Sequence, residues 1–263
     1  SQETKGFKGK IYKFLTLGVT DLSPKTVAWD DKLGYFITVL GIPSAFLLHG
    51  YVGFIFGSIK ANPWWSTVLM PVIFLFSAMV SGIALVMFLY MIISWIRKVK
   101  IDMDCLDEVG KYLFYVLVFD FTLESLDQVH RIYEAEESFE ILHMLVNGQL
   151  NITLFVFQGL MGTIIPLVTL GIFRIYKPIP EIRRFLYLVI SSLVLFGIFF
   201  MRWNVVIGGQ LFSKSFLGFT SFKLGLIGTE GFLMAIFWMI LPFGILTFLL
   251  WLLPPWKKHE EME

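Results

Sequence analysis

The segment TVLMPVIFLFSAMVSGIALVMFLYMIISW, residues 67–95, contains no charged side chain and decides the fold class. A helix needs about 20 predominantly apolar residues to cross the hydrocarbon core of a bilayer, and this segment is longer than that. The whole chain agrees, with 57% hydrophobic residues, only 16% charged residues and a mean hydropathy of +0.76. Because a soluble globule cannot bury so large an apolar fraction, the sequence predicts an all-α integral membrane protein.

Other apolar segments also have the length of a membrane span, which gives six predicted transmembrane helices arranged as a bundle. Besides 67–95, they cover residues 33–57, 109–132, 149–173, 184–202 and 228–253. The segment 109–132 is the least apolar of the six because acidic residues occupy its second half. We therefore expect a transmembrane domain at 33–253, with a basic segment at 1–32 before it and a charged tail at 254–263 after it.

The distribution of basic residues predicts the orientation. If all six spans cross, the N-terminal segment, the loops 96–108 and 174–183 and the C-terminal tail share one side of the membrane. Those segments and the adjoining helix ends hold 16 of the 21 Lys and Arg residues, whereas the other side carries the acidic run Glu134, Glu136, Glu137 and Glu140. By the positive-inside rule, we expect a multi-pass protein of the cytoplasmic membrane with both termini in the cytoplasm.

Sequence signals for several chemistries on soluble substrates are missing. Cys105 is the one cysteine, so this chain cannot supply a disulfide, a CxxCH haem attachment motif or the ligands of an iron–sulfur cluster. The sequence also contains no phosphate-binding Gly-rich loop, HExxH motif or GxSxG motif. We expect neither catalysis by this chain alone nor a nucleic-acid partner.

The functional candidates are polar side chains at membrane depth, because burying charge in lipid is expensive. They are His49, Asp120, Glu124, Asp127, His130, Arg202, Asn204, Gln210 and Glu230. Asp120, Glu124, Asp127 and Arg131 follow one another by four, three and four residues, so they share one face of a helix. This stripe could relay protons, or it could tie helices together through ion pairs; the spacing leaves both interpretations open.

His49 lies near the outer end of its predicted helix. Three glycines at helical spacing leave a groove beside it, which suits either close helix packing or a flat ring lying against the backbone; they are Gly50, Gly53 and Gly57. The next turn contains Trp64 and Trp65, a pair typical of membrane-interface anchors, with stacking against a ring as the alternative.

Three stretches, taken in order, resemble a known family. They are SAFLLHGYVGFIFGSIKANPWWSTVLMPVIFLFSAMVSGIAL at 44–85, ESLDQ at 124–128 and MRWNVVIGGQ at 201–210. Together they resemble the membrane subunit of the polysulfide reductase family, also called the NrfD or PsrC family. The nearest pattern is that of the DsrP branch, which is associated with dissimilatory sulfur metabolism. The resemblance covers most of residues 30–253.

This resemblance implies a membrane subunit of a respiratory redox complex. Such a subunit exchanges electrons between menaquinone or ubiquinone and an iron–sulfur protein on the outer face, alongside further redox subunits of a multisubunit complex. It holds no haem or iron–sulfur cluster of its own.

The resemblance also implies roles for the candidate residues. His49 would bind the quinone through its ring nitrogens, with Trp64 and Trp65 at the border of the headgroup. Proton transfer would fall to Asp120, Glu124 and Asp127, and a supporting polar cluster would consist of Arg202, Asn204 and Gln210.

The chain departs from the family pattern in its number of helices. Family members usually have eight or more helices in two bundles, and much of the quinone site is built by the N-terminal bundle. Six spans are visible here, so the family's N-terminal helices are either missing from this chain or supplied by another subunit.

Other functional classes stay open on the residues alone. A b-type cytochrome membrane anchor would ligate haem with two histidines, and His49 and His130 both lie toward the outer ends of their helices. A secondary ion transporter would also place acids and glycines within its spans. A structural anchor that docks partners and binds no quinone is the third alternative.

Overall fold

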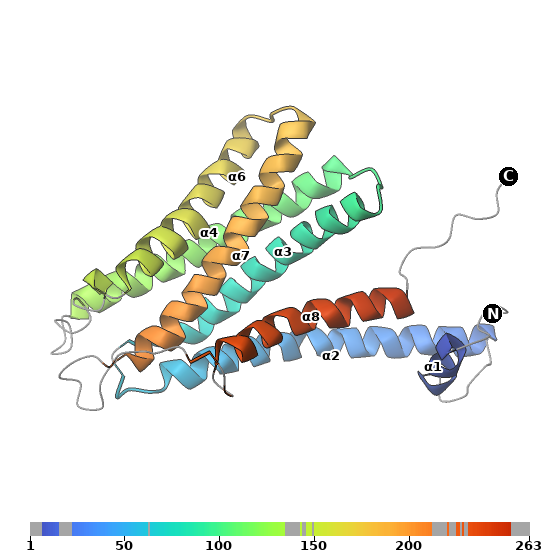
Figure 1. Cartoon of the computed structure of the whole chain (residues 1–263), viewed down its shortest axis with the longest axis horizontal. Helices are drawn as coiled ribbons and strands as arrows, with labels where there is room; N and C mark the ends of the chain where they lie inside the picture. The colour runs from blue at the N-terminus through green and yellow to red at the C-terminus, as the bar shows by residue number, and fades with distance from the viewer. Residues whose placement is uncertain are drawn as a thin grey trace. The chain divides into compact units, whose positions relative to one another are not determined.

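The computed structural model describes residues 7–15, 23–62, 64–134, 143, 146–148, 150–211, 220, 225–226, 228 and 231–253. Their regular secondary structure is helical throughout, and no strand occurs among them. The order is α1 (Phe7–Leu15), α2 (Pro24–Gly57), α3 (Met70–Ile96), α4 (Met103–Glu134), η1 (Ile152–Ile164), α6 (Ile165–Ile175), α7 (Pro180–Gln210) and α8 (Phe232–Leu252) (Figure 1). The all-α membrane class predicted from the sequence is confirmed.

Among the described residues, five segments are long and apolar enough to cross a membrane: α2, α3, the continuous run of η1 and α6, α7, and α8. They correspond to five of the six predicted spans. The sixth, 109–132, lies within α4, whose charged second half keeps it out of this apolar set. α4 has 32 residues, about 48 Å at 1.5 Å per residue, so its length is sufficient to cross beside its neighbours.

The chain divides into two compact units, residues 1–39 with 223–263, and residues 40–222. In the first unit, the hydroxyl group of Tyr12 donates a hydrogen bond to the backbone carbonyl of Leu252, which joins α1 to the end of α8. α2 is continuous from Pro24, so the predicted start of the transmembrane domain at residue 33 falls inside a helix. The predicted charged tail, 254–263, lies outside the described residues.

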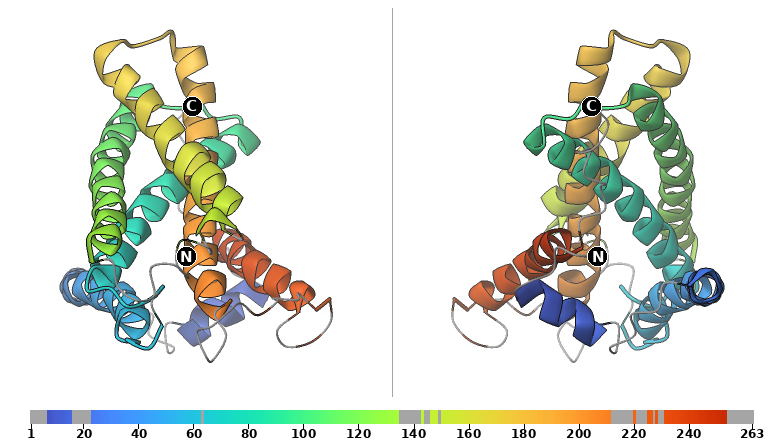
Figure 2. Two further views of the ribbon diagram at one scale, coloured as in Figure 1. Left: turned by 90° about the vertical axis from the view of Figure 1, so that its left-hand side faces the viewer. Right: turned by 90° about the vertical axis from the view of Figure 1, so that its right-hand side faces the viewer.

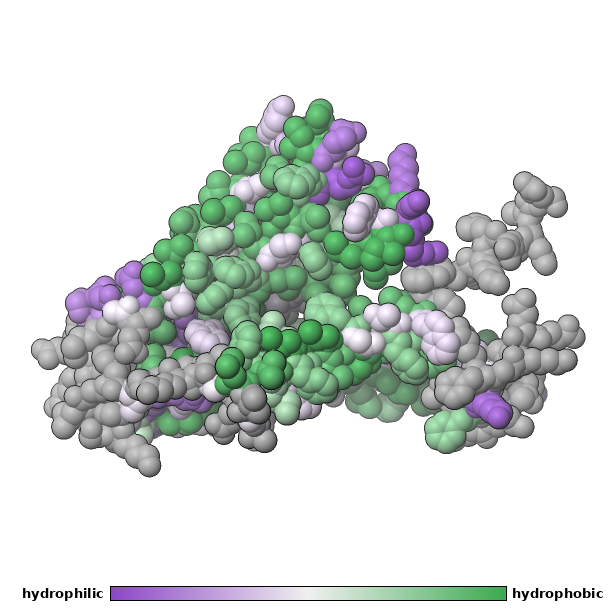
Figure 3. Space-filling model, viewed as in Figure 1, coloured by the Kyte–Doolittle hydropathy of each residue, from purple (hydrophilic) through white to green (hydrophobic). Residues whose placement is uncertain are grey.

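The second unit contains a bundle of α3, α4, the η1–α6 run and α7. α4 and α7 lie on opposite sides of it, and α3 and η1–α6 cross between them (Figure 2). Buried apolar side chains from these helices form its core: Val80, Ala84, Met87, Met91, Leu106, Leu113, Leu117, Leu170, Phe173, Tyr187, Ile190 and Val194. On the face in Figure 3, hydrophobic residues cover the middle of the bundle and hydrophilic residues gather at its ends, as expected of a membrane protein.

Two glycines allow a close backbone contact between helices of this bundle. A Cβ atom added to Gly162 of η1 would lie 2.2 Å from the Cα atom of Gly197 on α7. The two backbones therefore touch, which is the small-residue packing that membrane helices use in place of a hydrophobic driving force. This contact fixes the position of η1 against α7.

η1 is wound as a π-helix over Ile152–Ile164. In a π-helix each carbonyl accepts a hydrogen bond from the amide five residues later. Pro166 follows at once and has no amide hydrogen, so the carbonyl of Gly162 lacks the partner that an α-helix would provide. π-helical turns are frequently found at functional sites.

Candidate functional site

A cavity of about 610 Å³ lies between α3, α4, η1 and α7 at one end of the bundle. We call this the Trp64 end, because the loop 58–69 forms part of it. Apolar side chains make up much of the lining, including Trp64, Met70, Ile73, Phe121, Leu154, Phe155, Met201 and Val205. Polar side chains also converge on it, including Glu124, Asp127, Gln128, Arg131, Gln158 and Asn204. An apolar cavity with a few convergent polar groups is typical of a site for a small organic molecule.

Hydrogen bonds connect three helices and the loop along the wall of this cavity. Nε2 of Gln158 on η1 donates to both carboxylate oxygens of Glu124 on α4, at 3.2 Å each. Nδ2 of Asn204 on α7 donates to Oε1 of Gln158 at 2.8 Å. The indole N–H of Trp64 donates to the carbonyl oxygen of Asn204 at 2.9 Å. The half-buried Glu124 is thus held by a neutral amide at the edge of the cavity.

Asp120 and Arg202 lie next to this network. Asp120 is only 2% exposed, and its Oδ1 atom has no hydrogen-bond partner in the described part of the chain. Arg202 donates to Oγ of Ser77 at 2.8 Å and to the carbonyl of Phe74 at 3.2 Å, and its guanidinium lies 3.9 Å from the centre of the Phe74 ring. Arg202 is close enough to both Asp120 and Glu124 to interact electrostatically, which offsets part of the cost of burying them.

Asp127 ties α4 to the tryptophan loop. Its Oδ1 accepts a hydrogen bond from the hydroxyl of Thr67 at 2.6 Å, and its Oδ2 accepts one from Nε of Arg131 at 2.9 Å. The guanidinium of Arg131 lies 5.6 Å from the centre of the Trp64 ring, within the range of a cation–π interaction. The acidic stripe was open to two interpretations, a proton relay and a set of structural links. The hydrogen bond between Asp127 and Thr67 is a structural link.

The two tryptophans lie against the end of α7, where consecutive glycines make room for them. A Cβ atom on Gly209 would lie 2.1 Å from Cε2 of Trp65, and one on Gly208 would lie 2.9 Å from Nε1 of Trp64. Nε1 of Trp65 also donates to the carbonyl of Val205 at 2.6 Å. Trp64 is 6% exposed and lines the cavity, whereas Trp65 does not. Both rings are therefore fastened to α7.

His49 lies on the exposed surface of α2 and does not line the cavity. Its Nδ1 atom is 3.0 Å from a backbone carbonyl one turn earlier in the same helix. Two of the three glycines near it serve helix packing, since a Cβ atom on Gly53 would lie 2.6 Å from Cα of Pro71 and one on Gly57 would lie 2.7 Å from the carbonyl of Thr67, whereas a Cβ atom on Gly50 would have no neighbour within 4 Å. Among the candidates that the structure describes, His49 is brought together with none of the others.

Two further described candidates, Gln210 and His130, do not line the cavity. Gln210 is the exposed last residue of α7, and its backbone carbonyl accepts a hydrogen bond from the hydroxyl of Thr220 at 3.2 Å. His130 is exposed near the end of α4. Glu230 lies outside the described residues. In the described part of the chain, no group of three His, Cys, Asp or Glu residues could hold a metal ion.

Gln158 is the central residue that the sequence analysis missed. It is buried and contacts two of the predicted residues, Glu124 and Asn204. Its signal was present in the sequence, because it is the one strongly polar side chain in FVFQGLMG, residues 155–162. Thr67 and Ser77 were missed in the same way. A hydroxyl or amide at membrane depth needs a partner as a charge does, so such residues are candidates on the same grounds.

Two comparisons with known proteins bear on the family of this chain. Over 103 residues, the chain is 37% identical to a subunit of selenate reductase from Mesobacillus selenatarsenatis. That match covers 37% of this chain and 24% of the relative, so it spans about a quarter of the relative's length. Residues 12–214 match the family described as Polysulphide reductase, NrfD. Since this match covers most of the chain, the family resemblance is confirmed and the protein belongs to the NrfD polysulphide reductase family.

Proposed function

We propose that the protein is the quinone-interacting membrane subunit of a multisubunit reductase complex. It exchanges electrons between menaquinone or ubiquinone and an iron–sulfur protein on the outer face of the cytoplasmic membrane. The family membership and the name of the relative, a subunit of selenate reductase, support a place in such a complex. The observation that carries the proposal is the cavity of about 610 Å³ with the carboxylate of Glu124 at its wall.

The lining of the cavity suits the headgroup of a quinone. A volume of this size lies within the range of small-molecule sites, which is about 300–1,000 Å³. Trp64 offers a buried aromatic ring for stacking, and Phe121 and Met201 offer further apolar contact. The hydrogen bonds that fasten Trp64 to α7 preorganise that surface before the ligand binds.

Glu124 is the group proposed to exchange protons with a quinone oxygen. Reduction of a quinone consumes two electrons and two protons, and the electrons pass to or from the iron–sulfur partner. A carboxyl group both accepts and donates a proton, and Glu124 lines the cavity. Asp120, one helical turn away, and Asp127 complete the proposed set for proton transfer. Arg202 and Asn204 support it through charge and hydrogen bonds, and Gln210 belongs to the proposed set at the end of α7.

His49 has a separate place in the proposal. Because it is exposed on α2 and outside the cavity, it would contact quinone only at the surface of the protein. The remaining finer proposals are orientation, with both termini in the cytoplasm, and a role in sulfur metabolism.

The test uses the intact complex, purified from native membranes in mild detergent. Mass spectrometry is expected to find an iron–sulfur subunit in stoichiometric amount, and a photoreactive quinone is expected to label the cavity lining. Glu124→Gln should lower quinol turnover by about 100-fold, within the usual contribution of an acid–base group, while the subunits stay assembled. Glu108→Gln, an exposed position on the same helix, is the matched control and should retain turnover. Recovery of the protein without a redox partner would contradict the proposal.

A secondary ion transporter is the second candidate. The buried Asp120 and the half-buried Arg202 favour it, since intramembrane charges also build ion pathways. Ion flux into proteoliposomes that contain the protein alone would support this function over the redox function.

A further inference from the structure

We propose that Gln158 is a positioning residue that presents the carboxylate of Glu124 to the cavity and keeps it out of an ion pair with Arg202. The inference rests on the proposed function, because it names the residue through which Glu124 acts. Gln158 does not itself exchange a proton with the quinone. It fixes the position of the Glu124 carboxylate, which does.

The first support is the contact between the two side chains. Nε2 of Gln158 lies 3.2 Å from each carboxylate oxygen of Glu124, so one amide group holds both oxygens. A glutamate side chain has several rotatable bonds, and fixing them costs conformational entropy. A proton-exchanging group also has to be held within a fraction of an ångström of its working position. In the described part of the chain, no residue other than Gln158 donates a hydrogen bond to the carboxylate of Glu124.

The second support is the way in which Gln158 is itself fixed. Its Oε1 accepts a hydrogen bond from Nδ2 of Asn204 at 2.8 Å, which directs Nε2 toward Glu124. Asn204 is 1% exposed, and its backbone carbonyl is held by the indole of Trp64. With Glu124 ionised, turning the Gln158 amide over would put an oxygen against the carboxylate, which is unfavourable. The network therefore supports one orientation of the amide.

The third support is the π-helical winding of η1. In an α-helix, side chains five residues apart point about 140° apart, because each turn has 3.6 residues. In η1, Gln158 and Thr163 both line the cavity, and the hydroxyl of Thr163 donates to the carbonyl of Gln158 at 3.1 Å. The backbone contact of Gly162 with Gly197 then holds this part of η1 against α7. Gln158 consequently has little freedom to move away from Glu124.

The fourth support is the position of Arg202. Its guanidinium is engaged on α3 by the hydroxyl of Ser77 and by the carbonyl and ring of Phe74. Glu124 interacts electrostatically with Arg202 but accepts its hydrogen bonds from the neutral Gln158. The positive charge of a guanidinium in direct contact would favour the ionised form of the carboxylate more strongly than a hydrogen bond from a neutral amide does. A neutral donor leaves Glu124 free to take up and release protons.

The test measures quinol turnover by the intact complex with Gln158→Leu, Glu124→Gln and both changes together. Gln158→Leu should lower kcat about 10-fold, with KM changed less than twofold and the pH profile of kcat displaced. In the Glu124→Gln background the same change should cause no further loss, because its effect passes through Glu124. Thr169→Val, on the same membrane segment, half-buried and outside the cavity lining, is the control and should leave kcat and the pH profile unchanged.

A second measurement does not depend on quinone chemistry. In pH-induced infrared difference spectra of the purified protein, the carboxyl C=O band that disappears in Glu124→Gln should shift in Gln158→Leu. If the leucine variant does not assemble, Gln158→Asn, which is one methylene shorter, should produce the same shift.

An unshifted band, or an equal loss of kcat in the presence and absence of Glu124, would overturn the role of Gln158. A shifted band in a complex that neither binds nor oxidises quinol would instead keep the contact between Gln158 and Glu124 and contradict the proposed function.

Discussion

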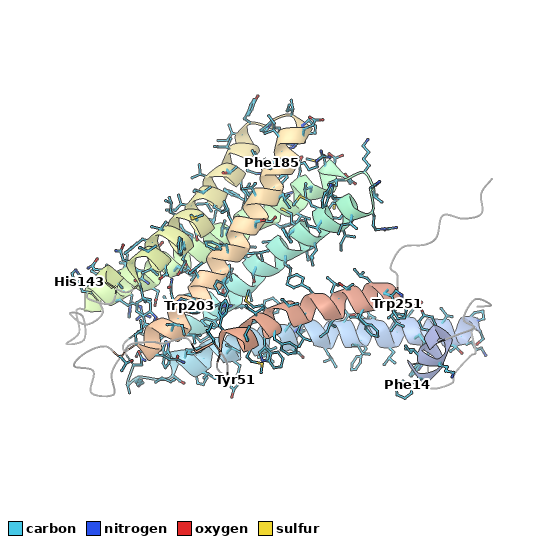
Figure 4. All side chains as sticks on the ribbon, viewed as in Figure 1. Phe14, Tyr51, His143, Phe185, Trp203 and Trp251 are labelled. Carbon is cyan, nitrogen blue, oxygen red and sulfur yellow. The ribbon has the colours of Figure 1, made fainter. Side chains whose placement is uncertain are left out.

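At the end of the bundle opposite Trp64, Asp107 of α4 contacts two arginines and a tyrosine. Oδ2 of Asp107 lies 3.2 Å from Nη1 of Arg183, and its Oδ1 accepts a hydrogen bond from the hydroxyl of Tyr187 at 2.9 Å. Arg174 donates to the backbone carbonyl of Asp107 at 3.3 Å. At the Trp64 end, by contrast, Glu124 is held by a neutral amide beside a cavity. Figure 4 marks the two ends, with Phe185 toward the Asp107 end and His143 and Trp203 toward the Trp64 end.

The two ends use buried charge for different purposes. At the Asp107 end both carboxylate oxygens are satisfied, and Gly110 lets the ring of Tyr187 approach so closely that a Cβ atom would lie 2.6 Å from it. At the Trp64 end, Oδ1 of Asp120 lacks a partner within the described residues and Glu124 borders empty volume. The comparison teaches that the mere presence of a buried acid does not indicate function. Unpaired buried atoms occur at both ends, because Nε of Arg174 and Nε of Arg183 also lack partners within the described residues. What the Trp64 end has in addition is a cavity beside a carboxyl group.

An apolar layer separates the two ends. Val80, Leu113, Leu117 and Val194 are each 0–1% exposed and pack together in the core.

The largest expected effect is on stability, at the Asp107 end. Asp107→Leu leaves the buried Arg183 without its anionic partner, which should destabilise the protein by about 3–5 kcal/mol. The loss should appear as a lower Tm in a detergent-solubilised thermal unfolding assay. Glu108→Gln, one residue along and exposed, should leave Tm unchanged. An Asp107→Leu variant with normal Tm but no quinol turnover would contradict this contrast between the two ends, because Asp107 would then be needed for the reaction and not for stability.

An intermediate effect is expected where η1 touches α7. Gly162→Ala places a methyl group 2.2 Å from the backbone of Gly197, so the helices have to separate, at a cost of about 1–3 kcal/mol. Because Gln158 lies one turn away, quinol turnover should fall together with Tm. Gly171→Ala is the matched control, since its Cβ atom would lie 3.5 Å from the ring of Phe114, an ordinary contact. Equal effects of the two changes would show that the Gly162 contact does not position the site.

The sequence predicted the helices better than it predicted the site. Long apolar runs are sufficient to place five spans, because crossing a bilayer depends mainly on length and hydropathy. The stripe of Asp120, Glu124 and Asp127 was also predictable, since helical spacing alone puts these residues on one face. The structure brings this stripe to the Trp64 end.

The contacts between helices could not be predicted in the same way. Gln158 meets Glu124 only because Gly162 and Gly197 set the register of η1 on α7 and because η1 is wound as a π-helix. Neither follows from hydropathy. For His49, counting residues along the helix gives its depth but not the direction in which it points around the helix axis. The glycine face of α2 turned out to pack against residues 67–71, and His49 is exposed.

The smallest expected effect is that of His49→Ala. Since His49 is exposed and bonds only within its own helix, its removal should leave Tm unchanged and lower quinol turnover by no more than about twofold. The measurement is steady-state turnover by the intact complex over a range of quinol concentrations, beside Glu124→Gln. If His49 contacts quinone at the protein surface, its removal would raise KM and leave kcat unchanged, because the contact would act on entry of the quinone and not on proton transfer. A loss of kcat as large as that of Glu124→Gln would move the proton-exchanging site from the cavity to α2 and would reverse the assignment made at the Trp64 end.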